Sequence, residues 1–223
     1  MRRWWLWLLI GLGVVGIGAA AWVWFGGGTA DPPTGLTAPP VEGSGEVYAI
    51  AQGGSTATFE IDEELRGRPN RVVGSTSDVV GNIRVDTADA SASSVGTIII
   101  SARTFATDSA FRDRAIRGPV ILNSADDDFE FITFEPISVE GLSGPIVEGE
   151  ELDFQVTGNL TVRGATAPVT FDVTAALRNG NIEGTAETTI NRSDFGIGIP
   201  SVPSVANVSE EVLIRLDFVA APA

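Results

Sequence analysis

The sequence of 223 residues contains no cysteine and no histidine, and all 14 of its basic residues are arginine. The lack of cysteine excludes a disulfide framework, a thiolate nucleophile and a cysteine-ligated metal site. The lack of histidine excludes the usual Ser-His-Asp machinery and every metal site built on imidazole. Proteins without cysteine occur on both sides of a membrane, so this absence does not indicate a compartment.

Basic residues are also few relative to acidic ones. The 14 arginines stand against 29 Asp and Glu, which gives a formal net charge of -15. Phosphates would be repelled by such a surface, so the composition argues against a nucleic-acid partner. Solubility of a surface domain is the simplest explanation of the charge, and a specific cationic partner is the alternative.

The N-terminus carries a long apolar run. Arg2 and Arg3 precede residues 4–25, which contain no charged side chain. As a helix, this run would span roughly 33 Å at about 1.5 Å per residue, enough to cross the hydrocarbon core. The positive-inside rule places the two arginines in the cytoplasm. The sequence thus predicts a single-pass transmembrane anchor over residues 1–25 of a cell-membrane protein, with the rest of the chain extracytoplasmic. The run has tryptophans at both ends, as in interfacial aromatic belts: Trp4, Trp5, Trp7, Trp22 and Trp24.

A cleaved signal peptide is the alternative to an anchor. Residues 28–30 offer a weak small-x-small cleavage site. The apolar run is longer than that of a usual signal peptide and places tryptophan close to the cut, so we favour the uncleaved anchor. No cysteine follows the run, which excludes a bacterial lipoprotein.

Residues 26–45 are rich in Gly, Pro, Thr and Ala and contain two Pro-Pro pairs. This composition is typical of a flexible, partly extended linker, which here would lift a domain off the membrane. Beyond residue 25, 12 arginines stand against 29 acids, a charge of -17. We expect a domain this acidic to be held away from an anionic lipid surface rather than to lie on it.

From residue 46 to residue 220 the chain alternates apolar and polar residues, the pattern of half-buried β-strands. The clearest case is the pair of stretches 152–162 and 169–177, which a short turn joins. Helical spacing occurs only over residues 108–117. An all-β fold of about eight strands and one short helix fits a closed antiparallel barrel better than a flat sheet, which would leave two long edges.

The chain also resembles the YceI family, whose members have a lipid- or polyisoprenoid-binding YceI-like domain. The matching segments are STATFEI near Ser55, VVGSTSDVVGNIRVD at 72–86, GTIIISARTFATDSAFRDRAIRG at 96–118, ITFEP at 132–136, GNLTVRGATAPVTFDVTA from Gly158, and NRSDFGIGIP at 191–200. The resemblance covers residues 46–220 and implies an extended, eight-stranded, lipocalin-like barrel with an apolar channel for an isoprenoid chain. Two departures are Asn159, where the family has Asp, and the atypical segment 119–131 after the helix.

Ten apolar positions of the predicted strands form an uncharged inward face. Eight-stranded barrels are about the size at which the interior is either filled by side chains or holds one slender ligand. Burying a hydrocarbon tail there would contribute roughly 0.8 kcal/mol per CH₂. An ordinary packed core would use the same residues, so that alternative stays open. The predicted lipid-binding residues are Phe59, Ile61, Phe154, Val156, Leu160, Phe171, Val173, Ile214, Leu216 and Phe218.

Three arginines, Arg112, Arg114 and Arg117, lie on the predicted helix near the expected barrel mouth. Their guanidinium groups are candidates to contact a pyrophosphate or another polar head group. Pairing with neighbouring acids is the simpler alternative. The acidic run 126–128 is expected to be solvated surface rather than a metal site.

The sequence therefore predicts a membrane-tethered, extracytoplasmic protein that binds a long-chain lipid, a polyisoprenoid or an isoprenoid quinone, in the barrel channel. No cofactor beyond that ligand is expected. No catalytic residues are marked out, so we do not expect an enzyme. The alternative is an envelope or stress-associated surface domain with a packed core that acts through protein contacts. Formation of a homodimer is left open.

Overall fold

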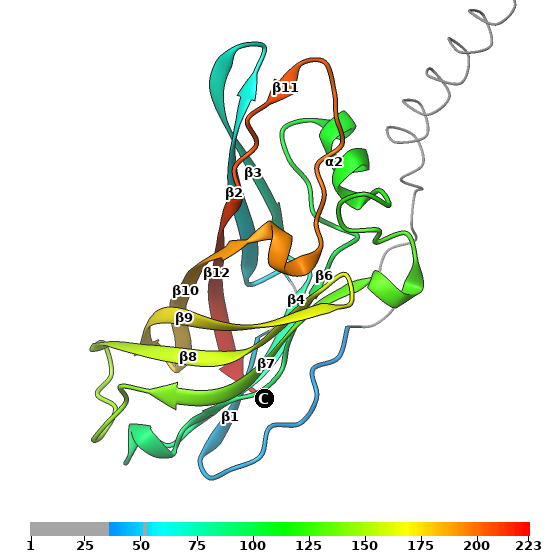
Figure 1. Ribbon diagram of the computed structural model, residues 1–223. Coiled ribbons are helices and arrows are strands. Elements are labelled where there is room, and N and C mark those ends of the chain that lie inside the picture. Colours follow the sequence, from blue (N-terminus) through cyan, green and yellow to red (C-terminus); the bar gives the residue numbers. More distant parts are fainter. Residues whose placement is uncertain (1–35, 51–52) are drawn as a thin grey trace, which may run out of the picture.

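The computed structural model describes residues 36–50 and 53–223, and this part of the chain is almost entirely β (Figure 1). It contains one α-helix, α2 (Ala110–Arg117), and three short 3-10 helices, η1 (Ala90–Ala92), η2 (Asp127–Phe129) and η3 (Arg192–Phe195). The strands are β1 (Glu46–Ile50), β2 (Thr56–Leu65), β3 (Arg68–Thr76), β4 (Val79–Val85), β5 (Ser94–Val95), β6 (Ile98–Ser101), β7 (Phe131–Glu140), β8 (Glu151–Val162), β9 (Ala165–Arg178), β10 (Asn181–Asn191), β11 (Val205–Ala206) and β12 (Glu211–Pro222).

The predicted anchor over residues 1–25 lies outside the described residues, as do residues 26–35 of the predicted linker. Within the described ranges, the helices are all too short or too polar to cross a bilayer. Residues 36–45 of the predicted linker run along β4 as an extended segment. Their backbone accepts hydrogen bonds from the barrel, with Asn82 Nδ2 donating to Pro39 O at 2.7 Å and Arg84 Nη2 donating to Val41 O at 3.1 Å. This end of the linker is therefore held on the domain.

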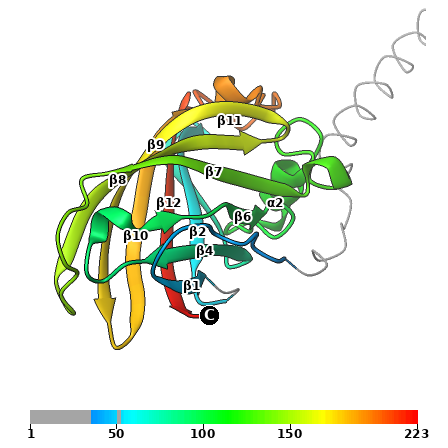
Figure 2. The ribbon, with the colours of Figure 1, turned by 90° about the horizontal axis from the view of Figure 1, so that it is seen from below.

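Eight strands close into an antiparallel barrel. Their hydrogen-bonded order is β1-β4-β6-β7-β8-β9-β10-β12, and β12 pairs back with β1 to complete the ring. In the closing pair, Ile50 lies opposite Ala220 and Tyr48 opposite Pro222. Figure 2 shows the ring from below. Closure removes the two edges that a flat sheet would expose, and it confirms the predicted eight-stranded all-β barrel with one α-helix.

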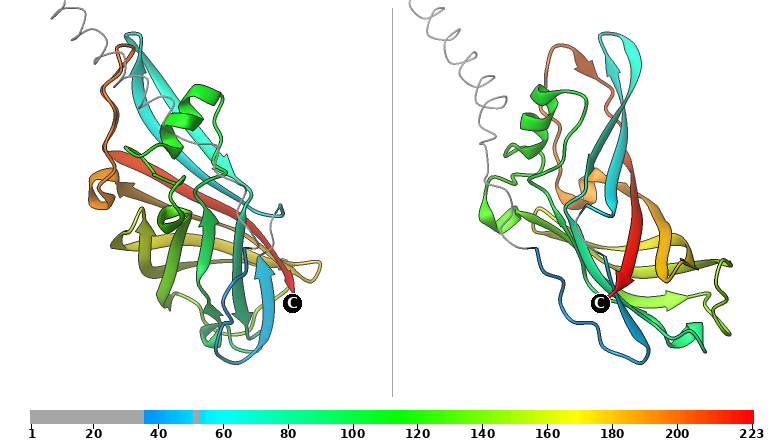
Figure 3. Two further views of the ribbon diagram at one scale, coloured as in Figure 1. Left: turned by 90° about the vertical axis from the view of Figure 1, so that its right-hand side faces the viewer. Right: turned by 180° about the vertical axis from the view of Figure 1, so that it is seen from behind.

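The barrel is extended at one end by a long hairpin of β2 and β3. The last strand, β12, pairs with β2 from Leu213 to Asp217 before it reaches β1. The hairpin then continues past the ring, and its tip pairs with β11 through Leu65 and Val205. The hairpin tip, β11 and α2 all lie at this end of the molecule (Figures 1 and 3). These elements lengthen the space that the barrel encloses.

The hairpin of β8 and β9 has the alternation that its sequence predicts. The turn uses Arg163 and Gly164, both with positive φ (52° and 76°), which matches the twist of a two-residue hairpin loop. Along β9, Val169, Phe171 and Val173 are buried, whereas the residues between them are exposed. The pleat therefore directs every second side chain of these strands into the barrel.

Candidate functional site

The barrel encloses a cavity of about 1020 Å³. Its wall consists of side chains from nearly every strand of the barrel, from α2 and from residues 197–208, and it is almost wholly aliphatic and aromatic. Pockets for drug-sized ligands usually measure about 300–1,000 Å³. The interior therefore has room for a large apolar ligand.

All ten side chains predicted to line a lipid channel contribute to the wall of this cavity. They fall into two groups of five by exposure. The buried group is Val156, Leu160, Phe171, Val173 and Phe218. The half-buried group is Phe59, Ile61, Phe154, Ile214 and Leu216. A fully packed core would bury all ten, so the second group indicates a hollow interior. That these ten residues bind a lipid stays a prediction.

Two glycines allow aromatic rings to lie flat against the sheet. The rings of Phe134 and Phe171 meet edge-on, with centroids 5.0 Å apart and planes at 74°. A Cβ at Gly158 would lie 2.7 Å from the Phe134 ring and 2.5 Å from a backbone oxygen of the neighbouring strand. A Cβ at Gly74 would lie 2.3 Å from the Phe59 ring. The absence of side chains at these two positions therefore fixes where the rings stand in the wall.

The cavity opens at the end marked by the hairpin tip and α2. Only four of its lining residues are exposed, namely Arg66, Phe111, Ser204 and Arg215. The first three lie on the β2–β3 turn, on α2 and just before β11, and these elements lie at the same end of the molecule (Figure 3). We call the opening bounded by Arg66, Phe111 and Ser204 the mouth.

An ion pair joins α2 to β2 beside the mouth. Arg112 Nη2 lies 3.7 Å from Glu63 Oε1, and both side chains line the cavity. Asn70 Nδ2 donates to the same carboxylate oxygen at 2.9 Å, and Arg112 also pairs with Asp108. The side chain of Glu63 is only 9% exposed. This partly buried ion pair, whose two charges cancel, is therefore the main polar feature of the cavity wall beside the mouth.

The three arginines predicted to contact a head group are placed differently from one another. Arg112 lines the cavity, whereas Arg114 and Arg117 are not among its lining residues. The guanidinium of Arg114 lies 5.9 Å from the centroid of the Phe111 ring. Arg117 Nη1 donates to the carbonyl oxygen of Phe105 at 3.1 Å and so supports the loop before the helix. Side chains of a helix point in different directions around its axis, so the three arginines, at positions 112, 114 and 117, do not all face the cavity.

Sequence reasoning missed four charged residues in the cavity wall, Glu63, Arg66, Arg192 and Arg215. Glu63 continues the inward alternation of Phe59 and Ile61, so a signal for it was present. Arg66 has a positive φ of 52° in the β2–β3 turn, where no apolar pattern marks a position. Glu63, Arg66 and Arg192 place charged groups toward the mouth and the adjacent rim, whereas Arg215 is an exposed residue of β12 that pairs with Glu187.

The rim beside the mouth is tied together by Arg192 and Glu210. Their side chains form an ion pair of 2.9 Å, and Arg192 also donates to the carbonyls of Ser209 and Ile197. Hydrogen bonds from Ser193, from its side chain and from its backbone, lower the pKa of the Glu210 carboxyl, and the Arg192 charge adds to this. Glu210 therefore stays ionised and fixes η3 against the start of β12.

The sequence model of the YceI-like domain matches residues 48–220. The chain belongs to the YceI family. Two solved structures share its fold. BcnA of Burkholderia cenocepacia is 20% identical, with a TM-score of 0.59 over 77% of this chain and 99% of that one. A polyisoprenoid-binding domain from Saccharophagus degradans, implicated in plant cell wall breakdown, is 12% identical, with a TM-score of 0.61 over 79% and 98%. At such identities the likeness shows the lipocalin-like barrel fold alone. A comparison with curated proteins finds no match.

Proposed function

We propose that this protein binds a long-chain lipid, a polyisoprenoid or an isoprenoid quinone, inside the barrel and presents it at the outer face of the cell membrane. The observation that carries the proposal is the apolar cavity of about 1020 Å³, with a wall that has polar groups mainly near one end. A ligand with a long apolar tail and a small polar head has the same distribution. The solved domain from Saccharophagus degradans, which is described as polyisoprenoid binding, supports this choice of lipid.

The balance of free energies favours a long tail over a short one. Burying about ten carbon atoms contributes roughly 8 kcal/mol at about 0.8 kcal/mol per CH₂. Association costs roughly 4–15 kcal/mol in lost freedom, and micromolar affinity needs about 8 kcal/mol after that cost. A tail of about twenty carbons or more therefore gives useful affinity from an uncharged wall, whereas a short acyl chain does not.

Arg112 is our candidate contact for the head group. It is the one arginine of the predicted three that lines the cavity, and it lies beside the mouth. In the structure its charge is shared with Glu63 and Asp108. A charged head group would have to compete with these carboxylates, whereas a quinone or an alcohol needs only one donated hydrogen bond.

The alternative of a packed-core domain that acts through protein contacts is disfavoured by the cavity. Extracting lipid from the purified full-length chain tests the proposal directly. We expect native mass spectrometry to show one bound isoprenoid per chain. Absence of a stoichiometric lipid would contradict the proposal, and chemical turnover of the lipid would instead indicate an enzyme.

A matched pair of variants on β12 makes this test specific to the cavity. Ile214 lines the cavity, whereas Val219 lies on the same strand, is 38% exposed and is not a lining residue. Ile214→Trp should reduce the fraction of chains that retain lipid, because the indole occupies cavity volume. Val219→Trp should leave that fraction unchanged. Equal retention in the two variants would mean that the lipid is held elsewhere.

A further inference from the structure

The charge of the described chain is divided unevenly between the mouth and the rest of the domain. Residues 62–71 and 108–117, which form the hairpin tip, α2 and the approach to it, hold six arginines against five acids. The other described residues hold six arginines against 23 acids. The two segments that carry Arg66 and Phe111 at the mouth are therefore weakly basic within a strongly acidic domain.

The acids of this region are already occupied. Asp62 accepts from Arg71 Nε at 2.8 Å, and Glu64 accepts from Asn207 Nδ2 at 2.8 Å. Glu63 pairs with Arg112 and accepts from Asn70, as described above. Asp108 pairs with Arg112, and Asp113 accepts from Thr107. The carboxylates are thus held in internal contacts.

Three exposed arginines of the same region remain available. Arg66, Arg68 and Arg114 have no carboxylate partner among the described residues. Phe111 lies on α2 with 57% of its surface exposed, and Arg114 lies over its ring at 5.9 Å. An exposed apolar ring on the same face as exposed arginines suits the interface of a membrane, where the ring lies at the boundary of head groups and acyl chains and the charges reach phosphates.

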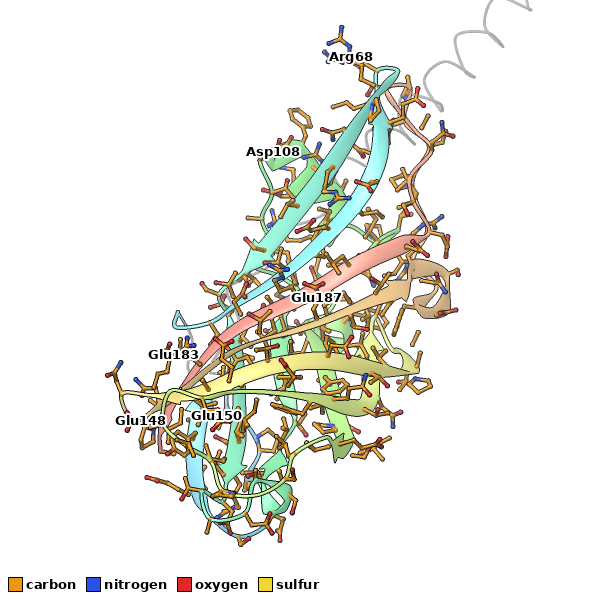
Figure 4. All side chains as sticks on the ribbon, turned by 90° about the vertical axis from the view of Figure 1, so that its left-hand side faces the viewer. Arg68, Asp108, Glu148, Glu150, Glu183 and Glu187 are labelled. Carbon is orange, nitrogen blue, oxygen red and sulfur yellow. The ribbon has the colours of Figure 1, made fainter. Side chains whose placement is uncertain are left out.

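We propose that the mouth docks on an anionic lipid bilayer, with Phe111 among the head groups and Arg66, Arg68 and Arg114 against the phosphates. The inference rests on the proposed lipid-binding function, because it gives the ligand a direct path between bilayer and cavity. In Figure 4, Arg68 lies at one end of the domain, and Glu148, Glu150 and Glu183 lie at the opposite end. The net charge alone predicts that the domain is held away from an anionic surface, and the uneven distribution of charge modifies that expectation. The bilayer repels the acidic end and attracts the mouth, so both forces turn the cavity toward the lipid.

The lack of cysteine in the chain allows this orientation to be measured with single labels. Ala206, exposed on β11 near the mouth, and Val147, exposed next to Glu148 at the opposite end, are each changed to Cys in separate full-length chains. Each chain carries a bimane label and is held in nanodiscs that contain head-group spin-labelled lipid. In nanodiscs with phosphatidylglycerol, we expect strong quenching at position 206 and little at position 147. Quenching should fall in pure phosphatidylcholine and at high salt.

The arginines are tested in the chain labelled at position 206. The combined substitution Arg66→Gln, Arg68→Gln and Arg114→Gln should reduce quenching several-fold, since each basic residue near an anionic surface contributes on the order of a fivefold gain in partitioning. Phe111→Ser should reduce it further. Arg178→Gln, which removes an exposed arginine on β9 outside the mouth region, is the matched control and should change nothing.

Lipid retention, measured on the same samples, separates failure of the docking from failure of the proposed function. Equal quenching at positions 206 and 147, or no change in quenching after the three substitutions, would contradict the docking proposal. If such a chain still retains lipid, the proposed lipid-binding cavity stands. A chain that holds no lipid overturns the proposed function instead. If the substitutions change self-association and not quenching, the mouth is a protein interface and the membrane proposal is wrong.

Discussion

Phe154 and Phe171 lie on neighbouring strands and line the same cavity, yet their surroundings differ. Phe171 is 8% exposed and packs edge-on against Phe134. Phe154 is half-buried, with part of its ring open to the cavity. A larger ring therefore meets packed neighbours at position 171 and free space at position 154.

We expect Phe154→Trp to shorten the bound chain or lower its affinity with little loss of stability. Phe171→Trp should overpack the wall and reduce the free energy of unfolding by about 1–3 kcal/mol. Denaturant unfolding and native mass spectrometry of both variants check this. If both variants lose stability equally and lipid retention does not change, the two residues belong to a packed core.

Substitutions of Arg112 and Glu63 should have opposite effects on the binding of a charged ligand. Arg112→Gln should weaken binding of an isoprenyl pyrophosphate more than binding of the matching uncharged alcohol, because charge-assisted hydrogen bonds contribute roughly 1.5–3 kcal/mol when shielded. Glu63→Gln should raise the affinity for the charged ligand, since it removes the carboxylate that lies 3.7 Å from Arg112 and competes for it. Titration of both ligands against each variant measures the difference. Changes of equal size for the two ligands would leave the pair a structural contact.

The sequence correctly placed ten apolar side chains in the cavity wall because a strand has only two faces, and that they bind a lipid stays a prediction. Once the apolar face is recognised, the pleat decides which residues point inward. The same alternation places Glu63 on the inward face, but the predicted inward face did not extend to a charged residue. The helix has no such binary choice, and its phase against the barrel depends on tertiary packing, so only Arg112 of the three arginines lines the cavity.

At the level of elements, the hairpin of β2 and β3 extends beyond what the apolar pattern of the sequence predicts. Apolar alternation stops at Ile61, yet β2 continues to Leu65 and β3 begins at Arg68. The polar stretch between them is held by backbone pairing and by side-chain contacts such as Arg71 with Asp62 at 2.8 Å. The side-chain hydrogen bond to Asp62 and the nearby negative charges raise the pKa of the Arg71 guanidinium. These cross-strand contacts depend on register, which the apolar pattern does not report.

The pairing of β7 with β8 depends on Gly158. A Cβ there would lie 2.5 Å from the carbonyl oxygen of Glu135, which is backbone and cannot move aside. Gly158→Ala should therefore reduce the free energy of unfolding by roughly 1–3 kcal/mol, as other overpacked sites do. Gly198→Ala is the control, because its Cβ would meet Val120 at an ordinary 3.6 Å. Denaturant unfolding of the two variants provides the comparison, and equal stabilities would show that the strands separate at little cost.

At the scale of the whole molecule, the ring closes only between the first and last strands of the domain. Ala220 is fully buried opposite Ile50, and the backbone N–H of Ala223 donates to Val47 O at 2.9 Å. The sequence predicted closure from the cost of open edges, without identifying the strands that meet. Strand partners far apart in the chain are set by the topology of the whole sheet. This is why the fold class was predictable while the closing register was not.

The predicted topology concerns the whole chain and rests on its first 25 residues. Arg2 and Arg3 precede an uncharged run, which predicts a cytoplasmic N-terminus and an extracytoplasmic barrel. We expect the intact protein to remain in the membrane fraction after a salt wash, and protease added to spheroplasts should digest the barrel while a cytoplasmic protein stays protected until lysis. An antibody against the barrel follows the loss. A soluble mature form that begins near Asp31 would show that the run is a cleaved signal, and the barrel would then reach the bilayer through its mouth alone.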